Sequence, residues 1–329
     1  MTALAPTLQS FFADRLAQQQ QASARTIASY RDTLHLLVTF IHERTGKKPA
    51  SLDWADLDAE MIVSFLHHLE HDRGNSIRTR NLRLTAIRGL FTYGAFCHPE
   101  HAGLIQQVLA IPPKRFDKRV VSYLTDSEAQ ALINATDTKR WEGRRDRAMI
   151  ALAIQTGLRV SELVGLDIGD ITLGAHASLT CTGKGRKQRS VPIAPPIAAL
   201  IAVWLRERSG AARDPLFPTR TGRRLSRDAV AQRVDVHAAT AAHVCPSLQG
   251  RKLHPHVLRH TCAMSLLRSG VDIAVIALWL GHAGIRSTTP YLHADLEIKE
   301  KALAMAAPQN IKPGRYRPSD TTLAFLESL

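Results

Sequence analysis

The stretch Thr156-Gly157-Leu158-Arg159-Val160-Ser161-Glu162-Leu163 marks a break between two predicted helices. The first helix is predicted over residues 145–155 and stops at Gly157, which readily adopts the conformation that ends a helix. A second helix is predicted to start at Arg159, near free N–H groups that favour an anion. Glu162 lies three residues on, on the same face, and could hold Arg159 in place. Taken alone, the stretch is typical of a surface ion pair, and an anion site is the functional alternative.

The residues after this break alternate helices with two short strands. Strands are predicted over residues 178–182 and 189–193, joined by a glycine-containing turn that carries Lys184, Arg186 and Lys187. Glycine allows a tight turn from which the cationic side chains project, so the tip suits a phosphate or a groove. The alternative is an ordinary solvated turn. Further helices are predicted over residues 196–208, 227–242, 255–270, 273–280 and 295–305.

The chain before its first adjacent prolines reads as helix throughout. Apolar residues recur at helical spacing over residues 26–45, 61–69 and 76–96. The run Ile111-Pro112-Pro113-Lys114-Arg115 breaks this pattern and predicts an exposed linker. Thr125 and Glu128 have the spacing of a capping box, so a second domain is predicted to start near Val121. The predicted parts are a helical domain, a linker, a mixed domain and a tail, over residues 1–112, 113–120, 121–310 and 311–329.

Composition limits the fold class and the kind of partner. The expected class is mainly α with a small β-sheet, in which a helical N-terminal domain precedes an α+β domain. The 329 residues carry a net charge of +14 and a pI near 10.1, which favours a polyanionic partner. No apolar run of roughly 18 residues and no signal peptide are visible, so no membrane span is expected. The four cysteines form no CxxC pair, which is typical of reduced thiols in a cytoplasmic protein.

Histidines and a tyrosine gather toward the C-terminal end. His256 and Arg259 share a helical face. His256 and His260 have the i, i+4 spacing of a metal site, but neither a third ligand nor an intervening glutamate accompanies them, so no metal site is expected. His282 precedes Tyr291 by nine residues, and alone these two residues are typical of packing.

Together the segments supply two arginines, two histidines, a lysine and a tyrosine. This set suits phosphoryl transfer without a metal or another cofactor. Two guanidiniums can clamp the non-bridging oxygens and offset the charge of the transition state. A phenol with a pKa near 10 is ionised in roughly one molecule per thousand at pH 7, so it needs a neighbouring base or cations. Lysine or histidine can supply the proton that the departing alkoxide needs.

Five motifs resemble those of the tyrosine recombinases or phage-type integrases, which include the Xer and Cre recombinases and lambda integrase. They occur in the family's order and at similar spacings: TGLRVSEL at 156–163, GKGRKQR at 183–189, HVLRH at 256–260, LGH at 280–282, and Tyr291. Each motif alone is weak, but five in order are specific. The helical N-terminal part resembles the family's core-binding, SAM-like domain, and the second part its catalytic domain. The resemblance implies a site-specific DNA recombinase or integrase, which could serve a transposable element.

The resemblance also implies roles for individual residues. Arg159 and Arg259 would bind the scissile phosphate, and His282 would hydrogen-bond to it. Tyr291 would form a 3′-phosphotyrosyl link that stores the bond energy, so that no ATP is needed. Lys184 would be the general acid to the leaving 5′ oxygen.

His256 would assist proton transfer with Tyr291, and Glu162 would support Arg159. Contacts to DNA are expected from Arg80, Arg83, Arg186 and Lys187. The expected partner is double-stranded DNA, held by a homo-tetramer or by a hetero-tetramer with related recombinases that works through a Holliday junction. Such a protein would act in the cytoplasm, at the nucleoid.

Three points stay open in the sequence. Pro290 requires that any helix holding Tyr291 start or kink there. The apolar stripe in residues 321–329 could pack on its own domain or, as is favoured, on a neighbouring subunit. Arg80 and Arg83 could form only a solvated charged face. Two other functions compete with recombination: a DNA-binding protein of this fold that no longer cuts, and a type IB topoisomerase.

Overall fold

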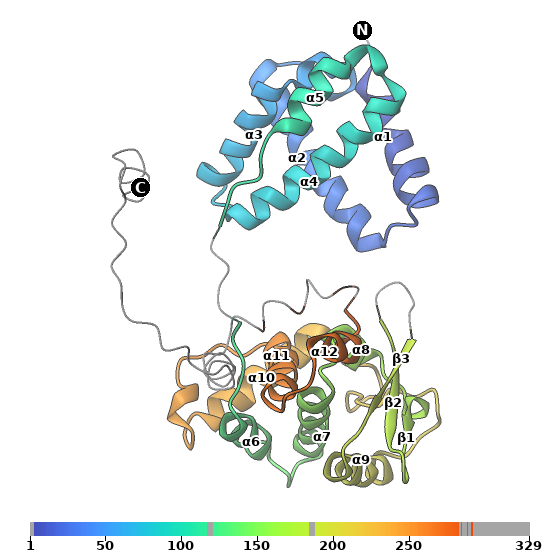
Figure 1. The fold of residues 1–329 in the computed structure, drawn as a ribbon, viewed down its shortest axis with the longest axis vertical. Helices are drawn as coiled ribbons and strands as arrows, with labels where there is room; N and C mark the ends of the chain where they lie inside the picture. The colour runs from blue at the N-terminus through green and yellow to red at the C-terminus, as the bar shows by residue number, and fades with distance from the viewer. Residues whose placement is uncertain are drawn as a thin grey trace, which may run out of the picture. The chain divides into compact units, whose positions relative to one another are not determined.

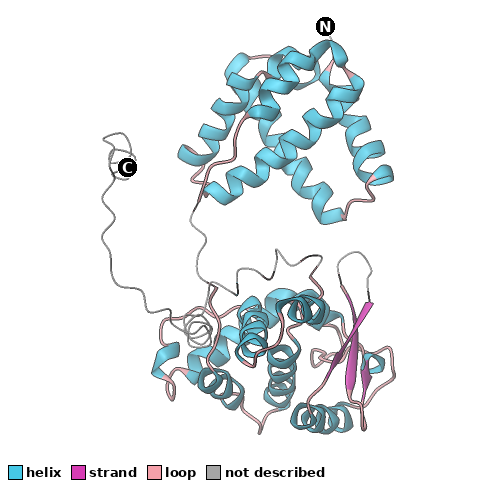
Figure 2. Ribbon diagram, in the orientation of Figure 1, coloured by secondary structure: helices cyan, strands magenta, loops and turns pink. Residues whose placement is uncertain are grey.

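The computed structural model describes residues 3–116, 121–183 and 188–282, together with residues 284, 288 and 291. The chain forms two compact units, Met1–Lys118 and Arg119–Leu329 (Figure 1). The first unit is helical, and the second combines helices with a small sheet (Figure 2). The predicted fold class, mainly α with a small β-sheet, is therefore confirmed. Several predictions lie outside the described residues: Lys184, Arg186, Lys187, Pro290, the helix over 295–305 and the tail over 311–329.

The three longest helices of the N-terminal unit begin at polar caps. Ser23, Asp58 and Ser76 each accept a hydrogen bond from the backbone N–H three residues on, which satisfies a donor that the helix start would leave free. The bounds are α1 Leu4–Ser10, a π-helix Phe11–Gln19, α2 Ala24–Thr45, α3 Ala59–His71, α4 Ile77–Cys97 and α5 Ala102–Ala110. The predicted segments 26–45, 61–69 and 76–96 are the cores of α2, α3 and α4.

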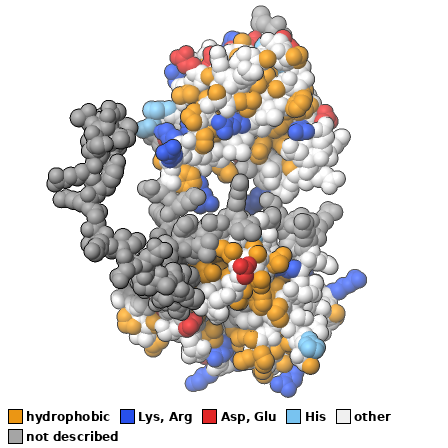
Figure 3. Space-filling model, in the orientation of Figure 1, with side chains coloured by type: hydrophobic (Ala, Val, Ile, Leu, Met, Phe, Trp, Pro, Cys, Tyr) orange, Lys and Arg blue, Asp and Glu red, His pale blue; other side chains and the backbone are white. Residues whose placement is uncertain are grey.

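The core of this unit gathers around a buried tryptophan. Trp54 is fully buried and meets the ring of Phe91 edge-on, with ring centroids 5.2 Å apart. Gly94 lets the indole approach α4, because a Cβ there would lie 2.2 Å from the ring. Figure 3 shows Lys and Arg side chains among apolar ones on one face of this unit.

The second unit places a three-stranded antiparallel sheet beside a helical bundle. The sheet has the order β1-β2-β3. The helices are α6 Asp126–Asn134, α7 Trp141–Thr156, α8 Val160–Gly165, α9 Pro195–Arg208, α10 Arg227–Ala241, α11 Pro255–Arg268 and α12 Ile273–Leu280. The strands are β1 Ile171–Thr172, β2 Ser178–Thr182 and β3 Gln188–Pro192. The Thr125–Glu128 capping box at the start of α6 is confirmed.

The helix α7 forms the centre of this unit. It packs against α11, α9 and α6, and its middle, from Ala148 to Ala153, is buried (Figure 1). A helix that is buried on several faces carries little amphipathic signal, because apolar residues surround it. No helix in the described ranges of either unit is long and apolar enough to cross a membrane.

Candidate active site

The break after α7 places Arg159 at the start of α8. Gly157 ends α7 in the left-handed region, with φ of 63°, and Arg159 is the N-cap of α8. The guanidinium of Arg159 donates to Glu162 Oε1 at 2.7 Å and to the carbonyl of Gly281 at 2.9 Å. The Arg159 side chain is still 28% exposed, whereas Glu162 is 3% exposed.

Gly157 also allows three helices to meet. A Cβ at this position would lie 2.5 Å from Leu280 Cδ2 and 3.0 Å from Cys262 Sγ, which belong to α12 and α11. The positive φ adds a second reason for glycine, because an L side chain is strained in this region. The break predicted from sequence is therefore the point where α7, α11 and α12 converge.

Arg259 fills this point of convergence. Its guanidinium donates to the carbonyls of Gly157 and Leu280, each at 2.7 Å, and only 4% of the residue is exposed. Burial, aided by the nearby charge of Arg159, lowers the pKa of Arg259 to about 10. Arg259 therefore remains a cation at neutral pH. Its two backbone contacts lie at helix C-termini, where partial negative charge stabilises a cation.

Glu162 is the carboxylate that balances these arginines. Burial alone would raise its pKa, but hydrogen bonds from Arg189 and Arg159 lower that pKa to about 2. Arg189 contacts both carboxylate oxygens, at 3.0 and 2.9 Å. Sequence reasoning missed Arg189, although it lies in the quoted GKGRKQR segment. Strand alternation could have identified it, because side chains two residues apart point to the same face of a strand. Arg189 therefore shares the inner face of β3 with the buried Val191.

Tyr291 lies against α11 and is 3% exposed. Its phenol oxygen contacts Nδ1 of His260 at 2.9 Å. Burial raises the pKa of Tyr291, while the charges of Arg259 and Arg159 oppose that rise. The partner of Tyr291 was also missed from sequence, where His260 entered as half of a rejected metal pair and as the last residue of the HVLRH motif, without a role.

The histidines of the site are held neutral at pH 7. Burial, followed by neighbouring positive charges, lowers the pKa of His260 and of His282 to about 4. The pKa of His256 is also lowered, by burial and then by His254. His282 Nδ1 lies 2.7 Å from Thr288 Oγ1, which fixes the orientation of the ring. Arg159 and Arg259 both act on the pKa of His256, His282 and Tyr291, so the predicted catalytic residues that the structure describes form one cluster.

This arrangement can bind a phosphate and present a phenol to it. Two guanidiniums supply positive charge and N–H donors, and a neutral imidazole contacts the phenol oxygen. Among the described residues, no group of three or more His, Cys, Asp or Glu could hold a metal ion.

The predicted DNA contacts on α4 occupy different environments. Arg80 is 6% exposed and donates to the carbonyl of Pro112 at 3.3 Å. Arg83 is half-buried, and burial lowers the pKa of both arginines. Arg88, on the same helix, donates to the carbonyl of Leu109 at 3.0 Å. Arg80 and Arg88 thus hold the segment after α5 against α4, and a DNA contact from Arg80 or Arg83 remains a prediction.

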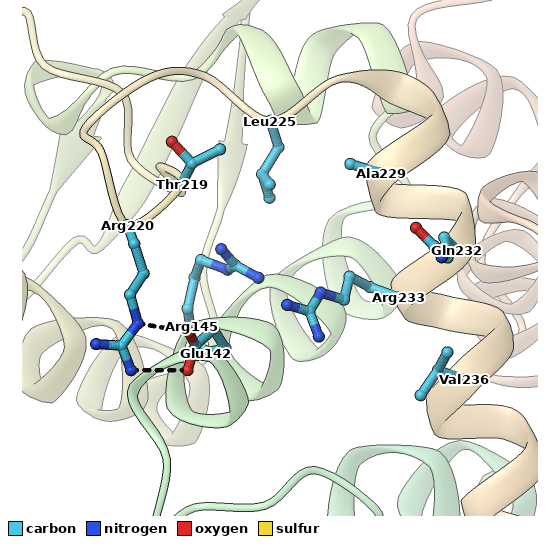
Figure 4. A pocket seen from close by; sticks show the side chains of 9 residues that line it. All are labelled: Glu142, Arg145, Thr219, Arg220, Leu225, Ala229, Gln232, Arg233 and Val236. Atoms are coloured by element: carbon cyan, nitrogen blue, oxygen red, sulfur yellow. Dashed lines mark hydrogen bonds and ion pairs between the residues drawn. The ribbon is translucent and has the colours of Figure 1, made fainter.

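A separate pocket of about 460 Å³ lies between the start of α7 and α10 (Figure 4). The arginines that line it are each near an acid. Arg220 pairs with Glu142 at 2.5 Å, and Arg145 and Arg233 lie 2.7 and 3.6 Å from Asp146. Positive charge in this pocket is therefore balanced locally by Glu142 and Asp146.

Comparison with known proteins gives consistent matches over the whole chain. The model of the phage integrase family matches residues 122–297, and that of the phage integrase N-terminal SAM-like domain matches residues 9–95. A protein of Sinorhizobium fredii (strain NBRC 101917 / NGR234) named "Putative integrase/recombinase y4rC" is 49% identical over 326 residues, covering 99% of this chain and 98% of that protein. Tyrosine recombinase XerC of Azotobacter vinelandii (strain DJ / ATCC BAA-1303) is 35% identical over 318 residues, covering 94% and 98%.

Solved structures share the fold. The XerH site-specific recombinase bound to palindromic difH substrate, in a post-cleavage complex, has a TM-score of 0.67 at 23% identity, with 88% of this chain and 82% of that chain covered. The Tn1549 transposon integrase in complex with transposon right end DNA has a TM-score of 0.68 at 15% identity, with 94% and 100% covered. At these identities the likeness concerns the fold.

Proposed function

Because the chain belongs to the phage integrase family of tyrosine recombinases, we propose that it cuts and rejoins DNA at a specific site through a covalent bond to Tyr291. The observation that carries the proposal is that the Tyr291 phenol contacts His260, the residue after Arg259, while Arg259 and Arg159 donate to the successive carbonyls of residues 280 and 281. A scissile phosphate bound by these arginines would lie next to the phenol. The net charge of +14 supports a polyanionic substrate.

In the proposed reaction the Tyr291 oxygen attacks the phosphorus and the bond to the 5′ oxygen breaks. The product is a 3′-phosphotyrosyl link, which keeps the energy of the bond for rejoining. Arg159 and Arg259 hold the non-bridging oxygens and offset the developing charge. His282, whose Nδ1 is engaged by Thr288, presents Nε2 to the phosphate.

Two further groups complete the proposed proton transfers. His256 assists the transfer from Tyr291, and Lys184, outside the described residues, protonates the leaving 5′ oxygen. Glu162 positions Arg159 through the contact at 2.7 Å. Phosphate contacts from Arg186 and Lys187 would add affinity that does not depend on sequence.

The proposed assembly is a tetramer on two DNA duplexes that passes through a Holliday junction. It contains four copies of this chain or combines it with related recombinases, and it acts in the cytoplasm at the nucleoid, in the service of a transposable element. In this assembly residues 321–329, which lie outside the described residues, dock on the neighbouring subunit. The named relatives support the class of reaction, since they include tyrosine recombinase XerC.

Covalent trapping on nicked DNA tests the proposal. Wild-type protein should form an adduct that survives denaturation, and Tyr291→Phe should form none while it still binds DNA, because only the phenol oxygen is lost. Tyr93→Phe is the matched control, since its ring packs against Phe11 in the N-terminal unit. An adduct formed by Tyr291→Phe would overturn the assignment of the nucleophile, and loss of cleavage in EDTA would overturn a metal-free mechanism.

The same preparation separates recombination from the two competing functions. A DNA-binding protein that no longer cuts would give no adduct with the wild-type chain. A type IB topoisomerase would relax supercoiled DNA without exchanging strands between two sites. Strand exchange between two copies of the target site is the outcome expected here.

The lysine assignment has its own test. Lys184→Ala should regain cleavage on a substrate with a 5′-bridging phosphorothiolate, because sulfur leaves without protonation. Lys187→Ala serves as the matched variant. If the substrate restores Lys187→Ala rather than Lys184→Ala, the general acid is Lys187.

A further inference from the structure

His260 is placed directly against the proposed nucleophile. It follows Arg259 on α11, and its Nδ1 lies 2.9 Å from the Tyr291 phenol oxygen. The two rings meet edge-on, with centroids 5.6 Å apart and planes at 61°. Tyr291 is 3% exposed, and its contact with the half-buried His260 is partly buried.

Protonation states fix the direction of this hydrogen bond. Burial, then the charges of His256 and His254, lowers the pKa of His260 to about 4, so the imidazole is neutral at pH 7. Burial raises the pKa of Tyr291, so the phenol keeps its proton. The phenol O–H is therefore the donor, Nδ1 is the acceptor, and the hydrogen of the neutral imidazole lies on Nε2.

The charged groups around His260 explain why it is neutral before DNA binds. His254, His256 and Arg259 all lie on or beside α11 and all disfavour the imidazolium, and His282 is in electrostatic contact with His260. A bound phosphate carries the opposite charge, which favours a protonated imidazole. Binding of DNA therefore strengthens His260 as a base at the moment when the phosphate reaches Tyr291.

We propose that His260 is a catalytic residue, the base that removes the proton from Tyr291 during cleavage. As the Tyr291 oxygen forms its bond to phosphorus, the O–H bond breaks and the proton passes to Nδ1. The bond between phosphorus and the 5′ oxygen breaks in the same step, and that oxygen takes its proton from the general acid. On rejoining, the imidazolium returns the proton to the departing Tyr291 oxygen.

This role rests on the proposed function, because it requires Tyr291 to be the nucleophile. It differs from the part given above to His256, which assists transfer from a more exposed position on the same helix. The ring centroids of His256 and His260 lie 6.5 Å apart, so the two imidazoles occupy separate positions beside Tyr291 and the phosphate.

Single-turnover cleavage of a nicked substrate tests the proposal with two variants. His260→Ala should cleave about 10²- to 10⁴-fold more slowly than wild type, the usual effect of losing a general base. His260→Asn places an amide oxygen near Nδ1 that can accept a hydrogen bond but cannot take the proton, so it should be slow as well. Both should bind DNA with wild-type affinity.

Added imidazole distinguishes a base from a structural residue, because only the loss of a base should leave a cleavage rate that imidazole restores. Imidazole should enter the space left in His260→Ala and restore part of the rate, and more of it as the pH rises through the pKa of imidazole. His243→Ala, which removes an exposed histidine at the end of α10, should cleave like wild type with or without imidazole. If His260→Ala fails to fold, His260→Asn, of similar shape, decides the question.

The outcomes distinguish a failure of the proposed role of His260 from a failure of the proposed nucleophile, Tyr291. A wild-type rate in His260→Asn would show that His260 only orients the phenol, and a wild-type rate in His260→Ala would overturn any role. If Tyr291→Phe still forms an adduct, the proposed function itself fails. If Tyr291→Phe is inert while His260→Ala is fully active, only the inference fails.

Discussion

Two arginine–carboxylate pairs lie at the two ends of α7 and use the same chemical groups in different ways. Arg145 pairs with Asp146 at 2.7 Å, and these side chains are 2% and 0% exposed. Arg159 pairs with Glu162, also at 2.7 Å, but its side chain is 28% exposed while Glu162 is 3% exposed. The carboxylates are equally buried, so the pairs differ in the exposure of the arginine.

The difference shows how a guanidinium becomes available to a ligand. Arg145 is enclosed by Asp146 and by the carbonyl of Pro218, at 2.9 Å, and Asp146 also meets His237 at 3.0 Å. Arg159 divides its donors between Glu162 and the carbonyl of Gly281 and still faces outward. A guanidinium has five N–H groups, so it can be held firmly and retain donors for a phosphate. The first pair is thus structural, and the second is suited to binding.

The largest expected effect is on stability, at the closed pair. Arg145→Met should lower the free energy of unfolding by about 3–5 kcal/mol, because it leaves Asp146 as a buried charge with weaker compensation. Urea denaturation measures this loss, and the double variant Arg145→Met/Asp146→Leu should recover part of it. The rate of cleavage per folded molecule should stay at the wild-type value. If Arg145→Met instead cleaves more slowly without losing stability, Arg145 acts in the reaction rather than in the fold.

At the open pair the expected effect is on rate. Arg159→Ala should slow cleavage by roughly two to three orders of magnitude, as for loss of a preorganised charge donor. Its thermal midpoint should change less than that of Arg145→Met, since Glu162 keeps both contacts to Arg189. Arg259→Ala should show the same loss of rate. If Arg159→Ala is instead unstable and fully active, the contrast between the two pairs disappears.

Lowering the pH removes the charge of Glu162 and with it the contribution of the Glu162 contacts to stability. The pKa of Glu162 is about 2 in the folded chain, below its ordinary value of 4.5. Its stabilising contribution is therefore complete above pH 4.5 and is lost as the pH falls toward 2, with a total on the order of 3 kcal/mol. The difference in stability between wild type and Glu162→Gln, followed by urea denaturation, should shrink over this window. A difference that stays constant with pH would show that the charge of Glu162 contributes nothing.

The smallest expected effect concerns α4, which also carries one buried arginine and one more exposed arginine. Arg80 resembles Arg145, since it is buried and bonded to a carbonyl, whereas Arg83 is more open. Arg83→Ala should weaken DNA binding and lower the slope of affinity against salt by about one, the change for one phosphate contact. The slope should change less for Arg80→Ala. If the slope of DNA affinity against salt is the same for wild type and both variants, Arg80 and Arg83 belong to an ordinary charged face that does not contact DNA.

Local signals in the sequence predicted the elements well. The capping residues Thr125 and Glu128 and the break at Gly157 act within a few residues, so their effects can be read along the chain. The pairing of Arg159 with Glu162 was predicted for the same reason, because i, i+3 neighbours share a helical face.

Contacts between distant segments could not be read in this way. Arg189 reaches Glu162 from β3, 27 residues away, and His260 reaches Tyr291 across 31 residues. The burial of Arg80 depends on Pro112, which returns to α4 after a further helix. Residue type and spacing indicated cations and imidazoles near a phosphate, but the pairing of each group required the packing of α7, α11 and α12.

The backbone contacts of Arg259 have a consequence for the order in which the protein is made. Its guanidinium bonds to Gly157, 102 residues earlier in the chain, and to Leu280, 21 residues later. The chain emerges from the ribosome with its N-terminus first, and domains fold as they emerge. The helical first unit can therefore fold long before Arg259 has both of its carbonyl partners. A nascent chain is expected to have no capacity to cut DNA until synthesis has passed both Leu280, the second partner of Arg259, and the proposed nucleophile Tyr291.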